Sequence, residues 1–140
     1  MSSGKPLPVA DEDSAGYWDA AAHGALALPR CSACGEFTMP PTIVCRECGS
    51  TDPRFAYERV DGSGTVRSWT VVRDSFLPGF EHDVPYVLVD VQLNAHPQIR
   101  MIGRLADGES EELQIGDPVE VAFDEIEGGV AVPSFVRTNP

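Results

Sequence analysis

Residues 31–49 read CSACGEFTMPPTIVCRECG and contain all four cysteines of this 140-residue chain. The cysteines form two C-x-x-C pairs, Cys31/Cys34 and Cys45/Cys48, separated by ten residues. With this spacing, two short turns can direct four sulfurs at one tetrahedral metal ion. A glycine follows each pair, where the absence of a side chain relieves the steric cost of the turn. The stretch therefore predicts a four-cysteine zinc ribbon of the rubredoxin-like type.

Other uses of the cysteines fit the sequence less well. Disulfides suit a secreted domain, but residues 1–10 contain no apolar core of a signal peptide. A redox C-x-x-C normally occurs once, near a junction of strand and helix, whereas this chain contains two such pairs. Iron also accepts four thiolates, so the spacing favours zinc without excluding iron. Because four cysteines complete the coordination sphere, the metal is expected to stabilise structure and not to catalyse a reaction.

The distribution of charge argues against several classes of function. The net charge is −12 at pH 7, and residues 61–140 contain fourteen acidic and five basic residues. A nucleic-acid backbone requires a basic surface, so nucleic-acid binding is disfavoured. It remains the alternative because four arginines lie in or near the ribbon: Arg30, Arg46, Arg54 and Arg59. No apolar run approaches the ~20 residues of a membrane span, and no targeting peptide is visible, so we expect a cytoplasmic protein that does not bind membranes.

Residues 1–29 are expected to form an extended arm followed by a helix. Asp11–Ser14 offers several N-cap residues, and the alanine-rich stretch Ala15–Leu28 ends before Pro29. Gly24 is a candidate break in this helix. Trp18 and Ala22 lie beside one helical face that is formed by four residues: Tyr17, Ala21, Ala25 and Leu28. So short a helix buries little by itself, and we expect it to pack on the ribbon or on a partner.

Residues 58–140 change to the period of two that is typical of β strands. Asp61-Gly-Ser-Gly64 is expected to form a bulge or turn, and Asp107–Glu112 a solvated acidic loop. Strands are predicted at Arg59–Arg73, Tyr86–Leu93, Ile99–Leu105, Val119–Phe123 and Val130–Val136. Five short strands with glycine-marked turns predict a small closed barrel of the OB type. The predicted organisation is thus an arm and helix (1–29), a zinc ribbon (30–57) and an OB-fold domain (58–140), mainly β.

Two groups of residues after the ribbon are candidates for contact with a ligand or partner. Strand alternation places Arg67, Trp69 and Arg73 on one face, where they could bind phosphate groups or form surface ion pairs. The segment Asp74–Asp83 carries three large apolar side chains: Phe76, Leu77 and Phe80. These side chains either plug the end of the barrel or dock on a partner.

The order of helix, ribbon and barrel resembles one family along nearly the whole chain. The matching stretches are Tyr17-Trp18, Leu28-Pro-Arg-Cys31, Cys34-Gly35, Pro40-Pro41, Cys45-Arg-Glu-Cys48-Gly49, Gly62-Ser-Gly-Thr-Val66, Thr70-Val-Val72, Pro85-Tyr-Val87, Val91-Gln-Leu93, Ile115-Gly-Asp-Pro-Val119 and Pro133-Ser-Phe135. In these positions the chain is similar to the small zinc-ribbon/OB-fold proteins of acyl-CoA metabolism, catalogued as domain of unknown function 35. The C-x-x-C pairs are shared by many ribbons, whereas the ordered set is much more specific.

This resemblance implies a non-catalytic accessory subunit with one structural zinc ion. Family members bind a thiolase-fold enzyme, such as a 3-ketoacyl-CoA thiolase, a hydroxymethylglutaryl-CoA synthase or a steroid side-chain aldolase, or they serve an enoyl-CoA hydratase. They help to form the channel for the CoA thioester, including in lipid and sterol degradation. Under this hypothesis the candidate partner or acyl-CoA contacts are Tyr17, Trp18, Arg67, Trp69, Arg73, Phe76 and Phe80.

The chain departs from the family at one loop and contains no evident catalytic group. Many relatives carry an acidic residue and a glycine after the second barrel strand, whereas this chain has Asn94-Ala-His96-Pro97, so no ligand contacts are transferred to this loop. None of the three histidines has a serine or cysteine partner at a telling spacing. A standalone acyl-CoA hydrolase, the third hypothesis, is therefore disfavoured.

Overall fold

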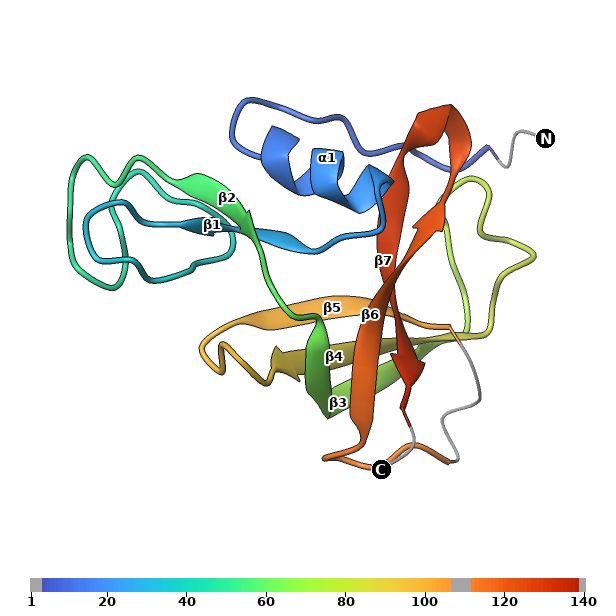
Figure 1. Ribbon diagram of the computed structural model, residues 1–140. Helices are drawn as coiled ribbons and strands as arrows, with labels where there is room; N and C mark the ends of the chain where they lie inside the picture. The colour runs from blue at the N-terminus through green and yellow to red at the C-terminus, as the bar shows by residue number, and fades with distance from the viewer. Residues whose placement is uncertain (1–3, 107–111, 139–140) are drawn as a thin grey trace.

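The computed structural model describes residues 4–106 and 112–138 of the chain. Most of the predicted acidic loop at 107–112 therefore lies outside the described residues. The elements, in chain order (Figure 1), are α1 (Ala15–Ala22), β1 (Ala27–Arg30), β2 (Ala56–Arg59), β3 (Ser63–Val72), β4 (Tyr86–Leu93), β5 (Arg100–Leu105), β6 (Pro118–Glu125), the 3₁₀-helix η2 (Glu127–Gly129) and β7 (Ala131–Arg137). Among these residues, no helix is long and apolar enough to cross a membrane.

Strands β3 to β7 close a five-stranded barrel in the order β3-β4-β5-β7-β6. The neighbours pair antiparallel except β5 and β7, which pair in parallel over two residues. Strand β4 has the predicted bounds, and every second side chain points into the barrel: Val87, Val89, Val91 and Leu93. The prediction of a mainly β chain with one N-terminal helix, a four-cysteine ribbon and an OB-type barrel is confirmed.

The barrel is packed around Phe135 of β7, which has no exposed surface. Gly103 of β5 lies directly against this ring, and a Cβ at position 103 would come within 2.9 Å of Phe135 Cε2. Any larger residue at position 103 would displace the ring, because protein interiors have no spare space of that size. Gly103 is therefore required for close packing of the barrel.

The inward and outward alternation of β3 reverses in the middle of the strand. Its register with β4 shifts by one residue between Val66 and Ser68, so Arg67 is an inserted, exposed residue. Beyond the shift, Trp69 packs partly buried against the core, and Arg73 is exposed just after the strand. The predicted common face of the three residues is wrong for Arg67, because the inserted residue changes the alternation and separates Arg67 from Trp69.

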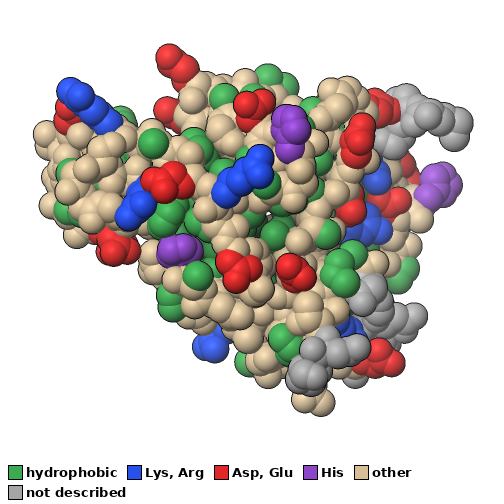
Figure 2. All heavy atoms as spheres, in the orientation of Figure 1, with side chains coloured by type: hydrophobic (Ala, Val, Ile, Leu, Met, Phe, Trp, Pro, Cys, Tyr) green, Lys and Arg blue, Asp and Glu red, His purple; other side chains and the backbone are tan. Residues whose placement is uncertain are grey.

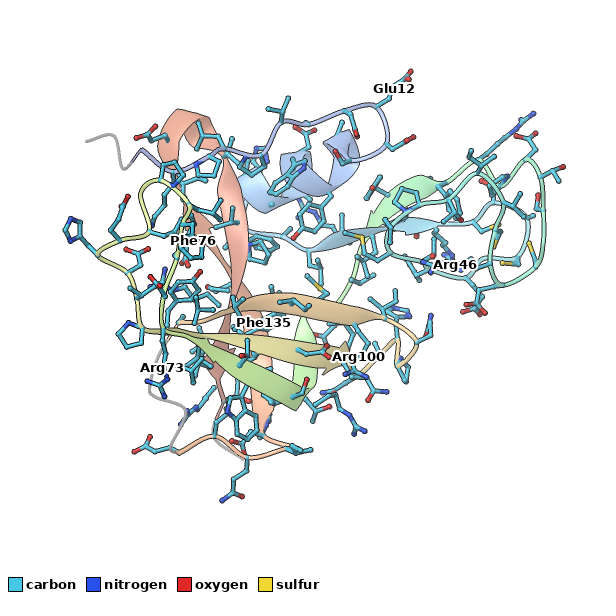
Figure 3. The ribbon with its side chains drawn as sticks, turned by 180° about the vertical axis from the view of Figure 1, so that it is seen from behind. Glu12, Arg46, Arg73, Phe76, Arg100 and Phe135 are labelled. Atoms are coloured by element: carbon cyan, nitrogen blue, oxygen red, sulfur yellow. The ribbon has the colours of Figure 1, made fainter. Side chains whose placement is uncertain are left out.

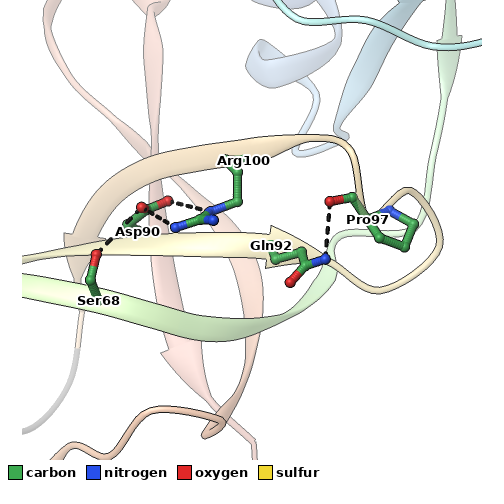
Figure 4. Close-up of polar contacts among 5 residues, drawn as sticks. All are labelled: Ser68, Asp90, Gln92, Pro97 and Arg100. Atoms are coloured by element: carbon green, nitrogen blue, oxygen red, sulfur yellow. Dashed lines mark hydrogen bonds and ion pairs between the residues drawn. The ribbon is translucent and has the colours of Figure 1, made fainter.

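Polar contacts on the outside of the barrel cover this irregular region (Figure 4). The Asp90 carboxylate of β4 accepts hydrogen bonds from Ser68 Oγ at 3.4 Å and from Arg100 Nε and Nη2 at 3.0 and 2.5 Å. Gln92 Nε2 donates to the backbone oxygen of Pro97 at 3.0 Å. These groups join β3, β4 and β5. We infer that their contacts fix the register of the strands and add little to the free energy of folding, because exposed ion pairs contribute little.

Helix α1 is shorter than the sequence predicted. It ends at Ala22, and Gly24 follows with a φ of +76°, the left-handed conformation that commonly ends helices. Leu28 lies in β1, which pairs antiparallel with β2, so its predicted place on one helical face with Tyr17 and Ala21 is wrong. Tyr17 and Ala21 are buried, as that face predicted. Strand pairing in the ribbon thus overrides the local helix propensity of residues 25–28.

The ribbon and the barrel meet through an aromatic contact. The rings of Phe37 in the ribbon and His96 in the β4–β5 loop lie with centroids 4.5 Å apart. The Arg30 guanidinium also lies over the Phe37 ring, 5.4 Å from its centroid. The β4–β5 loop, where the sequence departs from the family pattern, therefore contacts the ribbon.

Candidate metal centre and partner-binding surfaces

The four cysteine sulfurs converge on one point. All four lie within 4.8 Å of one another, with Cys31 Sγ 3.9 Å from Cys48 Sγ and Cys34 Sγ 3.8 Å from Cys45 Sγ. A tetrahedron with zinc–sulfur bonds of ~2.3 Å has sulfur–sulfur edges of about 3.8 Å. The sulfurs therefore fit a single zinc ion, and four thiolates leave that ion no open coordination position.

Two similar turns place these sulfurs. The backbone N–H of Gly35 donates to the Cys31 oxygen at 2.8 Å, and that of Gly49 donates to the Cys45 oxygen at 2.9 Å. Both glycines have a positive φ, +79° and +77°, which L-residues rarely adopt. The two glycines noted in the sequence are thus required by the conformation of the turns.

The environment of the thiols makes their deprotonation unequal. The pKa of Cys45 is lowered to about 7, chiefly because the backbone N–H of Cys48 donates to its sulfur. At Cys34 a similar N–H from Glu36 acts to lower the pKa, but desolvation and the three neighbouring thiols outweigh it and raise the pKa to about 12. A bound divalent cation would overcome this difference in pKa, because it stabilises all four thiolates together.

A four-cysteine zinc ribbon followed by a closed OB barrel defines a class of small two-part protein. Residues 18–54 match the family model described as the ChsH2 rubredoxin-like zinc ribbon domain. Residues 57–124 match the model described as the ChsH2 C-terminal OB-fold domain. The chain therefore belongs to the ChsH2 (DUF35) family of zinc-ribbon/OB-fold proteins, as the resemblance in its sequence predicted.

Similar proteins are named as parts of larger assemblies or as scaffolds. A chain in the solved structure of an Ltp2-ChsH2(DUF35) aldolase is 30% identical, with a TM-score of 0.79, over 94% of this chain and 98% of that chain. A probable enoyl-CoA hydratase alpha subunit of Thermomonospora curvata is 31% identical over 97% of this chain, which spans only 41% of that relative. A DUF35 domain-containing scaffold protein of Methanothermobacter thermautotrophicus is 28% identical over 76% of this chain and 78% of its own length.

The aromatic pair of α1 is largely covered by the chain itself. Tyr17 is 6% exposed, and its ring lies 5.0 Å from that of Trp18 and 6.3 Å from that of Phe123 in β6. Burial raises the pKa of the Tyr17 hydroxyl to about 12. Tyr17 thus attaches the helix to the barrel, and only the half-buried Trp18 offers surface to a partner. Partner contact through this helix remains a prediction.

The loop between β3 and β4 divides its apolar residues between two environments. Phe76 is 97% exposed and Leu77 55% exposed, so neither plugs the barrel. Phe80 is half-buried, with its ring 6.1 Å from that of Tyr86 and with Lys5 Nζ 5.0 Å from the ring centroid. Figure 3 shows Phe76 on the side of the molecule where the N-terminal arm passes. The alternative of folding back onto the barrel is wrong for Phe76 and Leu77.

A charged cluster anchors this loop. The Asp83 carboxylate accepts hydrogen bonds from Lys5 Nζ at 2.6 Å and from Arg104 Nη1 at 2.9 Å. The Arg104 guanidinium also lies 4.5 Å from the centroid of the Tyr86 ring. Arm, loop and β5 are therefore tied at one carboxylate. Sequence reasoning missed this cluster, because Lys5 and Asp83 are 78 positions apart and no local pattern links them.

We expect the loop anchor to fail only in acid. Hydrogen bonds from Lys5 and then Arg104 hold the pKa of Asp83 below its usual value. Its stabilisation is therefore present above the ordinary aspartate pKa of about 4 and is lost as the pH falls through the lowered value. Urea unfolding should show Asp83→Asn less stable than the wild type by a constant amount from pH 8 to 5, with the difference narrowing only below about pH 4.

A matched control for this prediction is Asp52→Asn. Asp52 pairs with Arg54 at 3.0 Å, but both side chains are at least 70% exposed, so Asp52→Asn should hardly change the free energy of unfolding. The proposed role of Asp83 would be contradicted if the difference in stability between Asp83→Asn and wild type already narrowed above pH 5. Equal effects of the two substitutions on stability would also contradict it.

Proposed function

We propose that this chain is a non-catalytic accessory subunit that binds a separate thiolase-fold or hydratase enzyme and helps to form its acyl-CoA channel. The observation that carries this proposal is the similarity, over 94% of the chain, to a chain of the Ltp2-ChsH2(DUF35) aldolase structure. The names of the other relatives, a hydratase subunit and a scaffold protein, agree with it. The proposed partners are aldolase, thiolase or hydratase subunits of lipid or sterol degradation.

The chemistry of the site supports a role in binding. The zinc site has a closed shell of four thiolates, so it offers no position for a substrate or an activated water. The interior of the barrel is filled by the chain's own side chains, with Phe135, Val89 and Leu93 completely buried. Substrate would therefore have to bind on the surface of this chain, where a partner enzyme can complete the channel.

The loop that carries Phe76 and Leu77 is the proposed contact beside the channel. Buried aromatic side chains are frequent hot spots of interfaces, and a rigid anchor loses less entropy on binding than a mobile one. The Asp83 cluster provides such an anchor for the loop. Arg67 and Arg73 lie at exposed positions, in β3 and just after it, and remain candidates for binding the phosphates of CoA, although Arg67 does not share a face with Trp69.

The surface charge disfavours the nucleic-acid alternative. On the face in Figure 2, Lys and Arg side chains are scattered among Asp and Glu side chains. A nucleic-acid surface would instead gather its cations along one groove or stripe.

Co-purification tests the proposal directly. The chain is expressed untagged with a tagged thiolase-fold or hydratase subunit encoded beside it, and the eluate is examined by size exclusion and metal content. We expect a stoichiometric complex with about one zinc ion per copy of this chain. The proposal would be overturned if none of the acyl-CoA enzymes encoded beside this chain bound it, or if the isolated chain turned over acyl-CoA.

Phe76→Asp is expected to weaken this complex at least about tenfold, since it removes a large apolar contact and places a charge at the interface. The matched control is Ile115→Asp, because Ile115 is also an exposed apolar residue but lies before β6, outside the Phe76 loop. Isothermal titration of the partner with each variant measures the change. Equal affinities of Phe76→Asp and wild type for the partner would show that this loop is not part of the interface.

A further inference from the structure

A groove of about 480 Å³ lies between the ribbon and the turn that precedes α1. Its apolar side is formed by Pro41 and Ile43 of the ribbon loop and by Phe55 and Tyr57 near β2. The opposite rim carries Glu12 and Asp13. We call this feature the ribbon–arm groove. It lies away from the Phe76 loop, which Figures 1 and 3 show at the other end of the molecule from the ribbon.

The apolar side of the groove is held open to solvent by the conformation of its loop. Ile43 is 90% exposed, although it is a large aliphatic residue. Thr42 Oγ1 donates to the Val44 oxygen at 2.5 Å and fixes the turn that presents Ile43. Arg46 Nη2 donates to the Met39 oxygen at 3.2 Å and closes the base of the loop. Ile43 lines the same groove as Pro41, Phe55 and Tyr57, and contiguous exposed apolar surface of this kind commonly marks an interaction site.

The acidic rim carries charge that the chain leaves unbalanced. Glu12 and Asp13 form no ion pair within residues 4–106 and 112–138, and no basic side chain lines the groove. Figure 3 shows Glu12 projecting outward from the turn before α1. An apolar surface beside uncompensated carboxylates is complementary to a segment that combines an apolar side chain with a cation.

The two sides of the groove are fixed relative to each other. Tyr57 Oη donates to the backbone oxygen of Asp13 at 2.6 Å. Helix α1 also lies so close to this ring that a Cβ on Gly16 would come within 2.4 Å of it. The groove is thus formed before any partner arrives, which lowers the entropic cost of filling it.

We propose that the ribbon–arm groove binds a segment of the partner enzyme in which an apolar side chain neighbours a lysine or arginine. This inference rests on the proposed function and specifies how the partner is recognised. Ile43 and Phe55 cover the apolar side chain, while Glu12 and Asp13 attract the cation and set the direction of the segment. Together with the Phe76 loop, the groove gives the enzyme two separated points of attachment, which fix the orientation of this chain on it.

The experiment uses the full chain with the tagged partner that co-purifies with it. Ile43→Asp should weaken the complex by about ten- to hundredfold, the loss expected for one buried aliphatic side chain, while Ile115→Asp should bind as the wild type does. Both variants replace an exposed isoleucine by a carboxylate, so they share any effect on folding or net charge. Equal affinity of Ile43→Asp and wild type would overturn the groove proposal.

Charge-reversal variants distinguish a specific contact between the acidic rim and a cation of the partner from an effect of the net charge of the chain. The double variant Glu12→Lys/Asp13→Lys should lower the association rate about tenfold and reduce its dependence on salt. The double variant Glu120→Lys/Asp124→Lys changes the net charge by the same amount at two exposed residues of β6 and should have a much smaller effect. Equal rates for the two double variants would contradict a specific acidic rim.

Photo-cross-linking identifies the occupant. A benzoylphenylalanine introduced at position 43 should form an adduct with one partner segment that contains an apolar residue beside Lys or Arg. An adduct at a segment without a cation would overturn the proposed chemistry. If wild type forms no complex at all, the proposed function fails, whereas a wild-type complex that tolerates Ile43→Asp refutes only the groove.

Discussion

Replacing Cys31 by serine is expected to abolish zinc binding and to unfold the ribbon. Cys31 is 1% exposed and supplies one of the four converging sulfurs. Structural zinc contributes on the order of 10 kcal/mol or more to the folding of small ribbons, which bury too little apolar surface to fold without it. Metal analysis should show zinc falling from about one ion per chain to near zero, and size exclusion should show aggregation as Phe37 and its neighbours lose their cover.

Ala33→Ser is the matched control for this substitution. It places a hydroxyl in the same turn, at an exposed position between the two cysteines of the first pair, without removing a ligand. This variant should retain its zinc and elute as the wild type does. A folded, metal-free Cys31→Ser protein would contradict the structural role of the ion.

Phe135→Ala is expected to produce the largest loss of stability in the barrel. The ring is completely buried and lies against Gly103, so its removal leaves a cavity that the closed barrel cannot easily fill. Truncations of buried phenylalanine cost about 3–5 kcal/mol, a large part of the stability of a small domain. Urea unfolding at constant zinc concentration measures this loss as a lower midpoint.

Phe76→Ala provides the comparison, because it removes the same ring from a position that is 97% exposed. It should change the free energy of unfolding by no more than about 0.5 kcal/mol. The same variant should impair partner binding, so the two phenylalanines separate stability from recognition. Similar unfolding midpoints for the two variants would show that Phe135 does not fill the core as described.

The features that sequence predicted well are those with a short-range physical signature. Two C-x-x-C pairs with following glycines define a metal ribbon by spacing alone, and the sulfurs do converge. The alternation of Val87 to Leu93 predicted a half-buried strand, and β4 has the expected bounds. The order of these signals along the chain was sufficient for the family.

Features that depend on tertiary contacts were not predictable in this way. Nothing near Arg67 signals an inserted residue, yet the insertion moves Trp69 from the expected outer face to the core. Residues 25–28 have good helix propensity, but β1 gains a pairing partner in the distant β2, where Leu28 lies opposite Glu58. The ribbon–arm groove likewise joins segments that only the fold brings together.

The contact between Phe37 and His96 limits how freely the two parts of this chain can be exchanged in engineering or in evolution. The ribbon and the barrel correspond to separate family models, which suggests interchangeable modules. In this chain, however, a ring from each part is packed against the other, with centroids 4.5 Å apart. A chimaera that joins a relative's ribbon to this barrel would have to transfer positions 37 and 96 as a pair, and those positions should vary together among close homologues.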